Sequence, residues 1–372
     1  MRVLHLYSGN LYGGIETLLV LLAHDRALCP AMEPHFGLCF EGRLSAELAR
    51  AGVPLHRLGS VRLARPLSVW RARRALRRLV GAEPFDVVVS HSPWVNAVFG
   101  PVLRSAPPPL VQWLHSPPND SWIDRWGRRT TPELVVSNSR YTASAAGPMF
   151  PRSEGEWMYP PVRLATPSAT VELRAAVRAE LETPQDAVVI VQVSRLEAGK
   201  GHRLHLDALG QLRQVPGWVA WMVGGAQRPF EMRYLAELEA RVAALGIADR
   251  VRFVGERSDV GQVLAAADIY CQPNLEPEPF GIVFLEALSA GLPVVSTNRG
   301  GPSEVVDESC GVLVSVGDVP ALAAVLERLI REGDARRTLG RGGPARARQV
   351  SDPATQLARL SEVLGRVTHN GS

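Results

Sequence analysis

The chain has 372 residues, and at about 150 residues per domain this length predicts two domains, each large enough to bury its own core. Apolar residues make up 46% and charged residues 21%, which is typical of soluble globular proteins, and no apolar stretch reaches the ~18 residues of a membrane-spanning helix. The net charge of +4 is uneven: residues 1–160 hold 18 arginines and 12 acidic residues, and the remainder holds 23 basic and 25 acidic residues. A positive first half is compatible with anionic lipid, a phosphorylated acceptor or nucleic acid as a partner.

The cysteines and the N-terminus indicate a reducing compartment. Cys29, Cys39, Cys271 and Cys310 have neither metal-type nor redox-type spacing, so we expect reduced packing residues. The chain begins directly with a strand pattern and lacks the layout of a signal peptide. We therefore expect a cytoplasmic protein, with the inner face of the membrane as a peripheral site if the basic helix described below contacts lipid.

Strand and helix patterns alternate from the first residue. Residues 1–7 predict a strand, a glycine-containing loop follows at 8–14, and the apolar periodicity of 15–28 predicts a helix. Further buried strands are predicted at 85–90, 110–114 and 134–137. This order is typical of a parallel sheet with helices on both faces.

The alternation stops between residues 147 and 186. Six prolines fall in this interval, so we interpret it as the interdomain connection plus a helix at 171–181. Strands are then predicted at 187–193, 218–223, 251–254, 268–271, 293–296 and 311–314. We expect Rossmann-like domains at 1–165 and 166–350, followed by a C-terminal segment, 351–372, whose helix packs back on the first domain.

The predicted fold class is therefore α/β, with two doubly wound domains that face each other across a cleft. Ligands of open α/β sheets bind at the carboxyl ends of the strands. Residues that directly follow predicted strands are therefore the candidates for a functional site.

Two candidate positions lie in the first domain. Gly13 and Gly14 end the first loop at the mouth of a helix, where backbone amides and the helix dipole favour an anion; a simple tight turn is the alternative. The loop is neither Gly-x-Gly-x-x-Gly nor a Walker loop, so it indicates neither a dinucleotide nor ATP hydrolysis. His115 ends a predicted strand, with a purely structural histidine as the alternative.

Lys200 is the only lysine in a chain with 41 lysines and arginines. It follows the first strand of the second half together with Arg195, and we expect Gly199 and Gly201 to allow a ligand to approach closely. A forked guanidinium and a compact ammonium group together suit a diphosphate. A surface lysine retained by chance is the alternative.

Glu278 and Glu286 are two carboxylates eight positions apart. On a helix this spacing leaves them about 80° apart and two turns apart along the axis. Glu286 can then meet one part of an elongated ligand, while Glu278, at the mouth of the helix, meets another. An exposed carboxylate pair without a binding role is the alternative.

The ordered set of motifs resembles the retaining glycosyltransferases of family 4, which have the GT-B fold. The resemblance is dense from 187 to 345 and thin between 17 and 110, where acceptors bind in that family. The matching segments are Gly-Gly-Ile-Glu (13–16), His115, Ser-Arg-Leu (194–196), Lys-Gly (200–201), Val-Gly-Gly (223–225), Phe-Val-Gly-Glu (253–256), Ala-Ala-Asp-Ile-Tyr (266–270), the Glu-x7-Glu run (278–286), Gly-Leu-Pro-Val-Val (291–295) and Gly-Gly-Pro-Ser-Glu (300–304).

This resemblance implies an acceptor domain at 1–165, a donor domain at 166–350, and a role for each matched residue. Arg195 and Lys200 would hold the diphosphate of a nucleotide sugar, Glu286 the ribose, and His115 the transferred sugar. His115, Arg195, Lys200 and Glu278 are thus the catalytic candidates. The donor-binding candidates are Gly13, Gly14, Glu256, Arg257, Phe280, Gly281, Ile282, Val283 and Glu286.

The activity that the resemblance implies is transfer of a hexosyl or N-acetylhexosaminyl unit, with retention, from a nucleoside diphosphate sugar to an unknown acceptor hydroxyl. We expect a UDP-linked donor and no cofactor. The sequence holds no Asp-x-Asp, so we expect no metal. A sugar-nucleotide 2-epimerase of the same fold and a non-catalytic nucleotide-sugar-binding subunit remain as alternatives.

One segment points to a partner. Residues 67–80 place apolar side chains on one helical stripe and five arginines, Arg71, Arg73, Arg74, Arg77 and Arg78, around the other side. The interpretations are a solvated helix face, and a patch that contacts an anionic membrane surface or an anionic acceptor. Nucleic acid is not expected, because no aromatic stacking platform accompanies the arginines.

Overall fold

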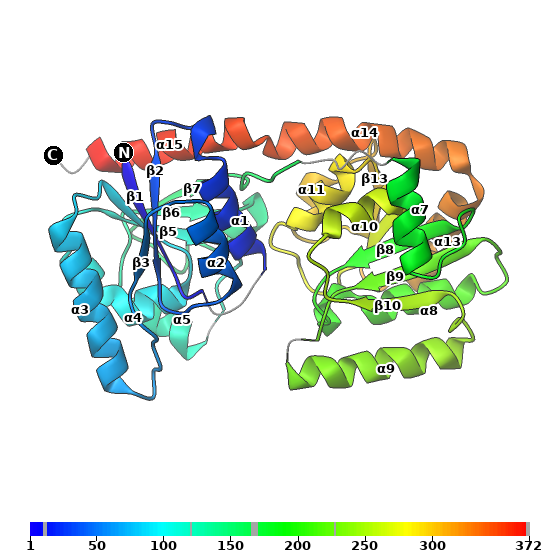
Figure 1. The fold of residues 1–372 in the computed structure, drawn as a ribbon, viewed down its shortest axis with the longest axis horizontal. Helices are drawn as coiled ribbons and strands as arrows, with labels where there is room; N and C mark the ends of the chain where they lie inside the picture. Colours follow the sequence, from blue (N-terminus) through cyan, green and yellow to red (C-terminus); the bar gives the residue numbers. More distant parts are fainter. Residues whose placement is uncertain (10–12, 120, 165–169, 227, 370–372) are drawn as a thin grey trace. The chain divides into compact units, whose positions relative to one another are not determined.

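The computed structural model describes residues 1–9, 13–119, 121–164, 170–226 and 228–369 (Figure 1). The chain divides into two compact units, one formed by Met1–Arg163 with Ser351–Ser372 and the other by Leu164–Val350. Each unit has a parallel sheet between helices, which confirms the predicted fold class of two doubly wound α/β domains. None of the described helices is long and apolar enough to cross a membrane.

The first unit is built on a seven-stranded sheet in the order β3-β2-β1-β4-β5-β6-β7. Its strands are β1 (Arg2–Tyr7), β2 (Glu33–Leu38), β3 (Leu55–Arg57), β4 (Val87–Ser90), β5 (Leu110–Leu114), β6 (Leu134–Ser137) and β7 (Glu154–Trp157). Its helices are α1 (Gly14–His24), the 3₁₀ turn η1 (Arg26–Leu28), α2 (Arg43–Arg50), α3 (Pro66–Ala82), α4 (Pro93–Leu103), α5 (Trp122–Gly127), α6 (Arg140–Ser144) and α15 (Pro353–His369).

The two faces of this sheet bury different helices. Val3, Val87 and Val89 belong to one core with apolar residues of α1, α2 and α15. Leu4, Leu6 and Val88, which alternate with them along the same strands, belong to a second core with α3 and α4. Figure 1 shows these helices on both sides of the sheet, as the period of two in a strand requires.

Strand β7 lies inside the interval that the sequence predicted to be free of strands. It is an edge strand that pairs only with β6, and Glu154 and Gly155 are exposed, so it has no apolar run to reveal it. Arg359 and Arg366 of α15 form ion pairs with Glu156 of this strand. Ion pairs with the C-terminal helix therefore stabilise strand β7, whose own sequence does not predict a strand.

The second unit has a six-stranded sheet in the order β10-β9-β8-β11-β12-β13. Its strands are β8 (Val188–Val193), β9 (Trp218–Val223), β10 (Val251–Gly255), β11 (Ile269–Gln272), β12 (Val294–Thr297) and β13 (Gly311–Val314). Its helices are α7 (Val171–Glu180), the 3₁₀ turn η2 (Ala198–Lys200), α8 (His202–Gln211), α9 (Pro229–Leu245), α10 (Val260–Ala266), α11 (Ile282–Ser289), α12 (Pro302–Val305), α13 (Val319–Arg331) and α14 (Gly333–Ser351).

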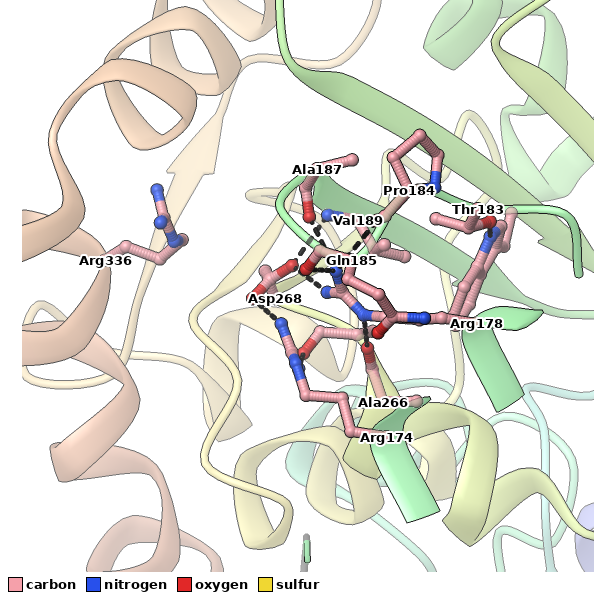
Figure 2. Close-up of polar contacts among 12 residues, drawn as sticks. Arg174, Arg178, Thr183, Pro184, Gln185, Ala187, Val189, Ala266, Asp268 and Arg336 are labelled. Carbon is pink, nitrogen blue, oxygen red and sulfur yellow. Dashed lines mark hydrogen bonds and ion pairs between the residues drawn. The ribbon is translucent and has the colours of Figure 1, made fainter. Parts of the chain in front are cut away.

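A buried arginine anchors α7 to this sheet (Figure 2). Arg178 is fully buried and donates to Asp268 Oδ2 at 2.7 Å and to the carbonyls of Ala187 and Gln185 at 2.8 and 2.9 Å. Asp268 also accepts the amide of Val189 at 2.7 Å, so it joins the starts of β8 and β11. A buried charge is tolerated only when it is paired in this way, and Asp268 therefore has a structural role.

Candidate functional site

The loop after β8 holds Lys200 on a rigid backbone. Gly201 has φ +74°, and a Cβ on it would lie 1.8 Å from the carbonyl oxygen of Pro273. The carbonyl of Gly199 accepts the amides of Leu275 and Glu276 at 2.9 and 3.1 Å. The two glycines thus permit the close approach of the loop that follows β11, a packing role that the sequence did not predict.

Lys200 and Glu278 meet in an ion pair. Lys200 Nζ lies 2.6 Å from Glu278 Oε2, and the two side chains are 22% and 13% exposed. Gln272 Nε2 donates to the same oxygen at 3.4 Å. The sequence placed both residues at strand ends but did not predict their contact, which brings a phosphate candidate and a sugar candidate together.

Glu278 does not lie on the helix. Helix α11 begins at Ile282, and Glu278 forms an isolated parallel bridge with Gly300, while its carbonyl accepts the amide of Gly301 at 2.7 Å. The angle calculated for two residues on one helix is therefore wrong for this pair. The backbone around residue 278 is instead positioned by the loop after β12.

The start of α11 has the geometry of an anion site. Gly281 caps the helix with φ +89°, and a Cβ there would collide with the Phe284 ring at 2.3 Å. Phe280 is 2% exposed and fixes the approach to the helix. The amides of Ile282 and Val283 lie in the first turn, where a helix has no acceptor of its own for its N–H groups.

Glu286 lies one turn into α11, and its carboxyl is desolvated. Burial raises the pKa of this carboxyl to about 7. Within the described part of the chain, no hydrogen bond to the Glu286 side chain is found. Both Glu278 and Glu286 contribute to the raised pKa of Tyr270, which is due first to burial, so the two carboxylates lie around one buried phenol. A carboxylate without a protein partner in this position is suited to accept hydrogen bonds from a bound ligand.

The other candidates of the second unit make different contacts. Arg195 is 45% exposed and pairs with Glu197 at 2.7 Å. Arg257 donates to Glu180 and, at 2.8 and 2.7 Å, to both oxygens of Asp259. Its guanidinium is thus committed to contacts within the unit, whereas Glu256 is exposed beside Gly225.

In the first unit, Gly13 is the N-cap of α1 and Gly14 its first residue. Residues 10–12 of the predicted anion loop lie outside the described residues. Directly after β5, His115 makes a 2.9 Å contact through Nε2 with Nδ1 of His91. Burial lowers the pKa of His115 to about 3, so this imidazole is neutral at physiological pH.

One group of described residues has metal-ligand chemistry. His35, His56 and Glu83 offer ligand atoms within 4.8 Å of one another. The facing nitrogens of His35 and His56 are 3.1 Å apart, and the Glu83 oxygens lie 3.8 and 3.9 Å from the two rings. A hydrogen bond between the rings accounts for the short contact, and the histidines lie within β2 and β3, not after their carboxyl ends.

The basic segment forms α3. Ala72, Leu76 and Val80 are buried, and Arg71, Arg74, Arg77 and Arg78 are exposed. Arg73 is only partly exposed and donates to the carbonyl of Val98 at 2.6 Å, so it does not belong to the free arginine surface. Leu67 and Trp70 are 69% and 56% exposed, which adds apolar surface that the sequence analysis did not single out.

Comparison with known proteins assigns both units. Residues 12–165 match the family described as Glycosyltransferase Family 4, and residues 174–346 match Glycosyl transferases group 1. The chain carries two glycosyltransferase domains. In three dimensions it matches the crystal structure of Anabaena Alr3699/HepE in complex with UDP-glucose, with a TM-score of 0.85 and 25% identity over 98% of this chain and all of that one.

The curated relatives of this chain include proteins that are named as glycosyltransferases and mannosyltransferases. It is 28% identical to the phosphatidyl-myo-inositol mannosyltransferase of Mycobacterium leprae, over 96% of this chain and 95% of the relative. It is 32% identical to the lipopolysaccharide core biosynthesis glycosyltransferase LpsE of Rhizobium meliloti, over 47% of this chain and about half, 49%, of the relative. These two proteins are what the chain resembles, and their substrates are their own.

Three buried polar residues that contact the candidate residues or their neighbours were not predicted from the sequence. His5 contacts His91, His91 contacts His115, and Gln272 contacts Glu278. Each is a buried polar side chain within an apolar strand or directly after one. Such a residue needs a hydrogen-bond partner, and this requirement was the available signal.

Proposed function

We propose that this glycosyltransferase moves a hexosyl or N-acetylhexosaminyl unit from a UDP-linked sugar to an acceptor hydroxyl, with retention of anomeric configuration. The observation that supports the proposal most is the Lys200–Glu278 pair at 2.6 Å, beside the first turn of α11 and the unpartnered carboxyl of Glu286. This arrangement offers a cation for phosphate, amides for an anion and two carboxylates for hydroxyl groups.

In the proposed donor complex, Lys200 and Arg195 stabilise the charge that grows on the diphosphate leaving group. Such preorganised electrostatic contacts contribute several kcal/mol. Glu286 accepts hydrogen bonds from the ribose hydroxyls, and Glu278 accepts them from the transferred sugar. The ion pair keeps Lys200 and Glu278 in place before the donor binds and is exchanged for contacts with it.

For retention, the acceptor hydroxyl attacks from the face that the diphosphate leaves. The bond between the anomeric carbon and the phosphate oxygen breaks as the new glycosidic bond forms, and a phosphate oxygen takes the proton of the hydroxyl. No carboxylate nucleophile is needed. Glu278, held by Lys200 and Gln272 before the donor binds, then orients the transferred sugar and does not attack it.

The nucleobase is tested by a screen of donors. The complexes of HepE contain UDP, whereas a Mycolicibacterium smegmatis relative, 29% identical, is named GDP-mannose-dependent. We expect UDP-sugars to raise the melting temperature more than GDP-, ADP- or dTDP-sugars at equal concentration, because a ligand at 100 times its Kd stabilises by about 2.7 kcal/mol. A larger shift with GDP-sugars would replace the UDP assignment.

The phosphate role is tested with Lys200→Ala. We expect turnover of the donor found in the screen to fall by a factor of about 100 or more, with the fold intact, because a preorganised phosphate contact is removed. Arg233→Ala, an exposed cation of α9, is the matched control. Near-normal turnover in the Lys200 variant would contradict the phosphate role. Epimerisation of the donor by the unmodified protein, in the absence of any acceptor, would favour a 2-epimerase.

A further inference from the structure

Three histidines lie in a row across neighbouring strands of the first unit. His5 lies in β1, His91 follows β4 and His115 follows β5, and the sheet order places these strands side by side. In the sheet, His5 of β1 lies opposite Val89 of β4, and Val89 lies opposite Val111 of β5. His91 comes two residues after Val89, and His115 comes four residues after Val111. Because side chains alternate, these even spacings put all three rings on one face of the sheet.

The rings are joined by two hydrogen bonds of equal length. His5 Nδ1 lies 2.9 Å from His91 Nε2, and His91 Nδ1 lies 2.9 Å from His115 Nε2. Trp113 stacks against both His91 and His115, which fixes the planes of these rings. Burial lowers the pKa of all three histidines, so each ring is neutral and has one protonated and one unprotonated nitrogen.

Three neutral rings in a chain allow two arrangements of their protons. In the first, each ring is protonated at Nδ1: His5 donates to His91, His91 donates to His115, and His115 has an N–H left at its open end. In the second, each ring is protonated at Nε2 and the donation runs in the reverse direction. The second arrangement leaves the N–H of His5 Nε2 at the closed end.

The surroundings of His5 Nε2 decide between the two proton arrangements. His5 is 0% exposed, and among the described residues its Nε2 has no hydrogen-bond partner. A buried N–H without an acceptor is rarer in folded proteins than an acceptor without a donor, because each unmade bond of the group is lost outright. The first arrangement leaves only a lone pair at this position and is therefore favoured.

We propose that His5 and His91 hold His115 in the tautomer with the proton on Nδ1, so that His115 presents a hydrogen-bond donor and not a base at the carboxyl end of β5. This inference rests on the proposed function for the nature of the acceptor, which is an oxygen of the transferred sugar. No described residue forms a hydrogen bond with His115 Nδ1, so this N–H is available to a ligand. His5 and His91 are positioning residues, because they act through His115.

The tautomer is tested without substrate by nitrogen NMR of the full-length protein labelled at histidine. Protonated and unprotonated ring nitrogens differ in chemical shift and in coupling to the ring carbons, and loss of a signal in His115→Asn assigns His115. We expect Nδ1 protonated and Nε2 unprotonated at neutral pH. A proton on Nε2, or an even mixture of tautomers, would overturn the proposal whatever the enzyme transfers.

The coupling through His91 is tested by two substitutions. His91→Phe keeps a ring but removes both nitrogens, so we expect a mixed His115 tautomer and a fall in kcat of about tenfold, the value of one hydrogen bond near 1.4 kcal/mol. His91→Gln retains one acceptor and one donor, and we expect it to restore the tautomer and kcat to within about threefold. The affinity for UDP should be unchanged in both variants, because UDP lacks the transferred sugar that His115 is proposed to contact.

The outcomes separate the inference from the proposed function. An unchanged His115 tautomer in His91→Phe would overturn the positioning role of His91. The expected tautomers with an unchanged kcat would retain the proton arrangement and overturn the contact between His115 and the sugar. The measurement on the unmodified protein stands even if neither variant folds.

Discussion

At the residue scale, Glu286 shows a conflict between stability and binding. Its side chain is partly buried and has no hydrogen-bond partner among the described residues, and desolvation raises the pKa of its carboxyl to about 7. The folded state therefore holds a proton between about pH 4.5 and pH 7 that the unfolded state has released. The free energy of unfolding falls as the pH rises through this window and stays low above it. A group that costs stability at working pH is expected where ligand binding requires it.

Glu286→Gln should therefore stabilise the protein while weakening nucleotide binding. We expect the free energy of unfolding to rise by about 1–3 kcal/mol at pH 8 and to change little at pH 4, since one pKa unit corresponds to about 1.4 kcal/mol. UDP binding should weaken by roughly 1.5–3 kcal/mol, because the ribose loses an ionised acceptor. Urea denaturation at both pH values and calorimetry with UDP measure the two effects.

The matched control is Glu239→Gln, which removes an exposed carboxyl of α9 in the same unit. It should change neither quantity measurably. Unchanged UDP affinity in Glu286→Gln would reject the ribose role. A variant that is less stable at pH 8 would show that the carboxylate is satisfied in the folded protein.

At the scale of the element, α3 is an amphipathic helix with a surface that its own unit does not use. Its arginines 71, 74, 77 and 78 are exposed, and within the described part of the chain they form no ion pair with an acidic residue. Arg74 lies over the ring of the exposed Trp70, 5.4 Å from its centre. Arginines next to exposed Trp and Leu side chains are typical of a helix that lies on an anionic membrane surface.

We therefore predict that the full-length protein sediments with vesicles containing phosphatidylglycerol and not with phosphatidylcholine alone. Changing Arg71, Arg74 and Arg78 to Gln should lower the partition at least tenfold, because each basic residue near an anionic surface contributes about 1 kcal/mol. The same change at Arg328, Arg331 and Arg337, which are exposed but ion-paired, is the control. Equal binding of both variants would leave α3 as a solvated helix face.

At the scale of the whole molecule, each unit has its own core and its own buried neutral histidines. Burial lowers the pKa of His5 and His115 to about 3 in the first unit, and of His202 and His205 to about 4 and 3 in the second. The unfolded chain binds protons at these groups near pH 6.5, and the folded chain does not. The free energy of unfolding is therefore not reduced by these histidines above pH 6.5, and it falls as the pH decreases toward 4.

Calorimetric melting at pH 7.5, 6 and 5 should show this loss in both units. Each buried histidine costs about 2 kcal/mol at pH 5, which outweighs the opposite effect of the single carboxyl of Glu286. His24→Gln, at an exposed position, should melt with the same pH dependence as the unmodified chain. Melting temperatures that do not fall between pH 7.5 and 5 would show that these histidines are charged in the folded state.

The sequence by itself determined the class of fold and the loops that hold the site. Apolar runs followed by glycines and charged residues revealed β4, β5, β6 and every strand of the second unit, because buried parallel strands have a local signature. Strands β2, β3 and β7 were missed, because β2 contains a proline and a glycine, β3 has only three residues, and β7 is a polar edge strand. Lys200, Glu278 and Glu286 were found by their residue type and their position after strands.

Only the tertiary structure decided which of these residues meet. The ion pair of Lys200 with Glu278 joins positions 78 residues apart, and the contact of His5 with His91 joins positions 86 apart. Local periodicity specifies that a strand exists but not which strand lies next to it. The neighbours of β1 follow from the burial of both faces of a seven-stranded sheet, and that is a property of the whole unit.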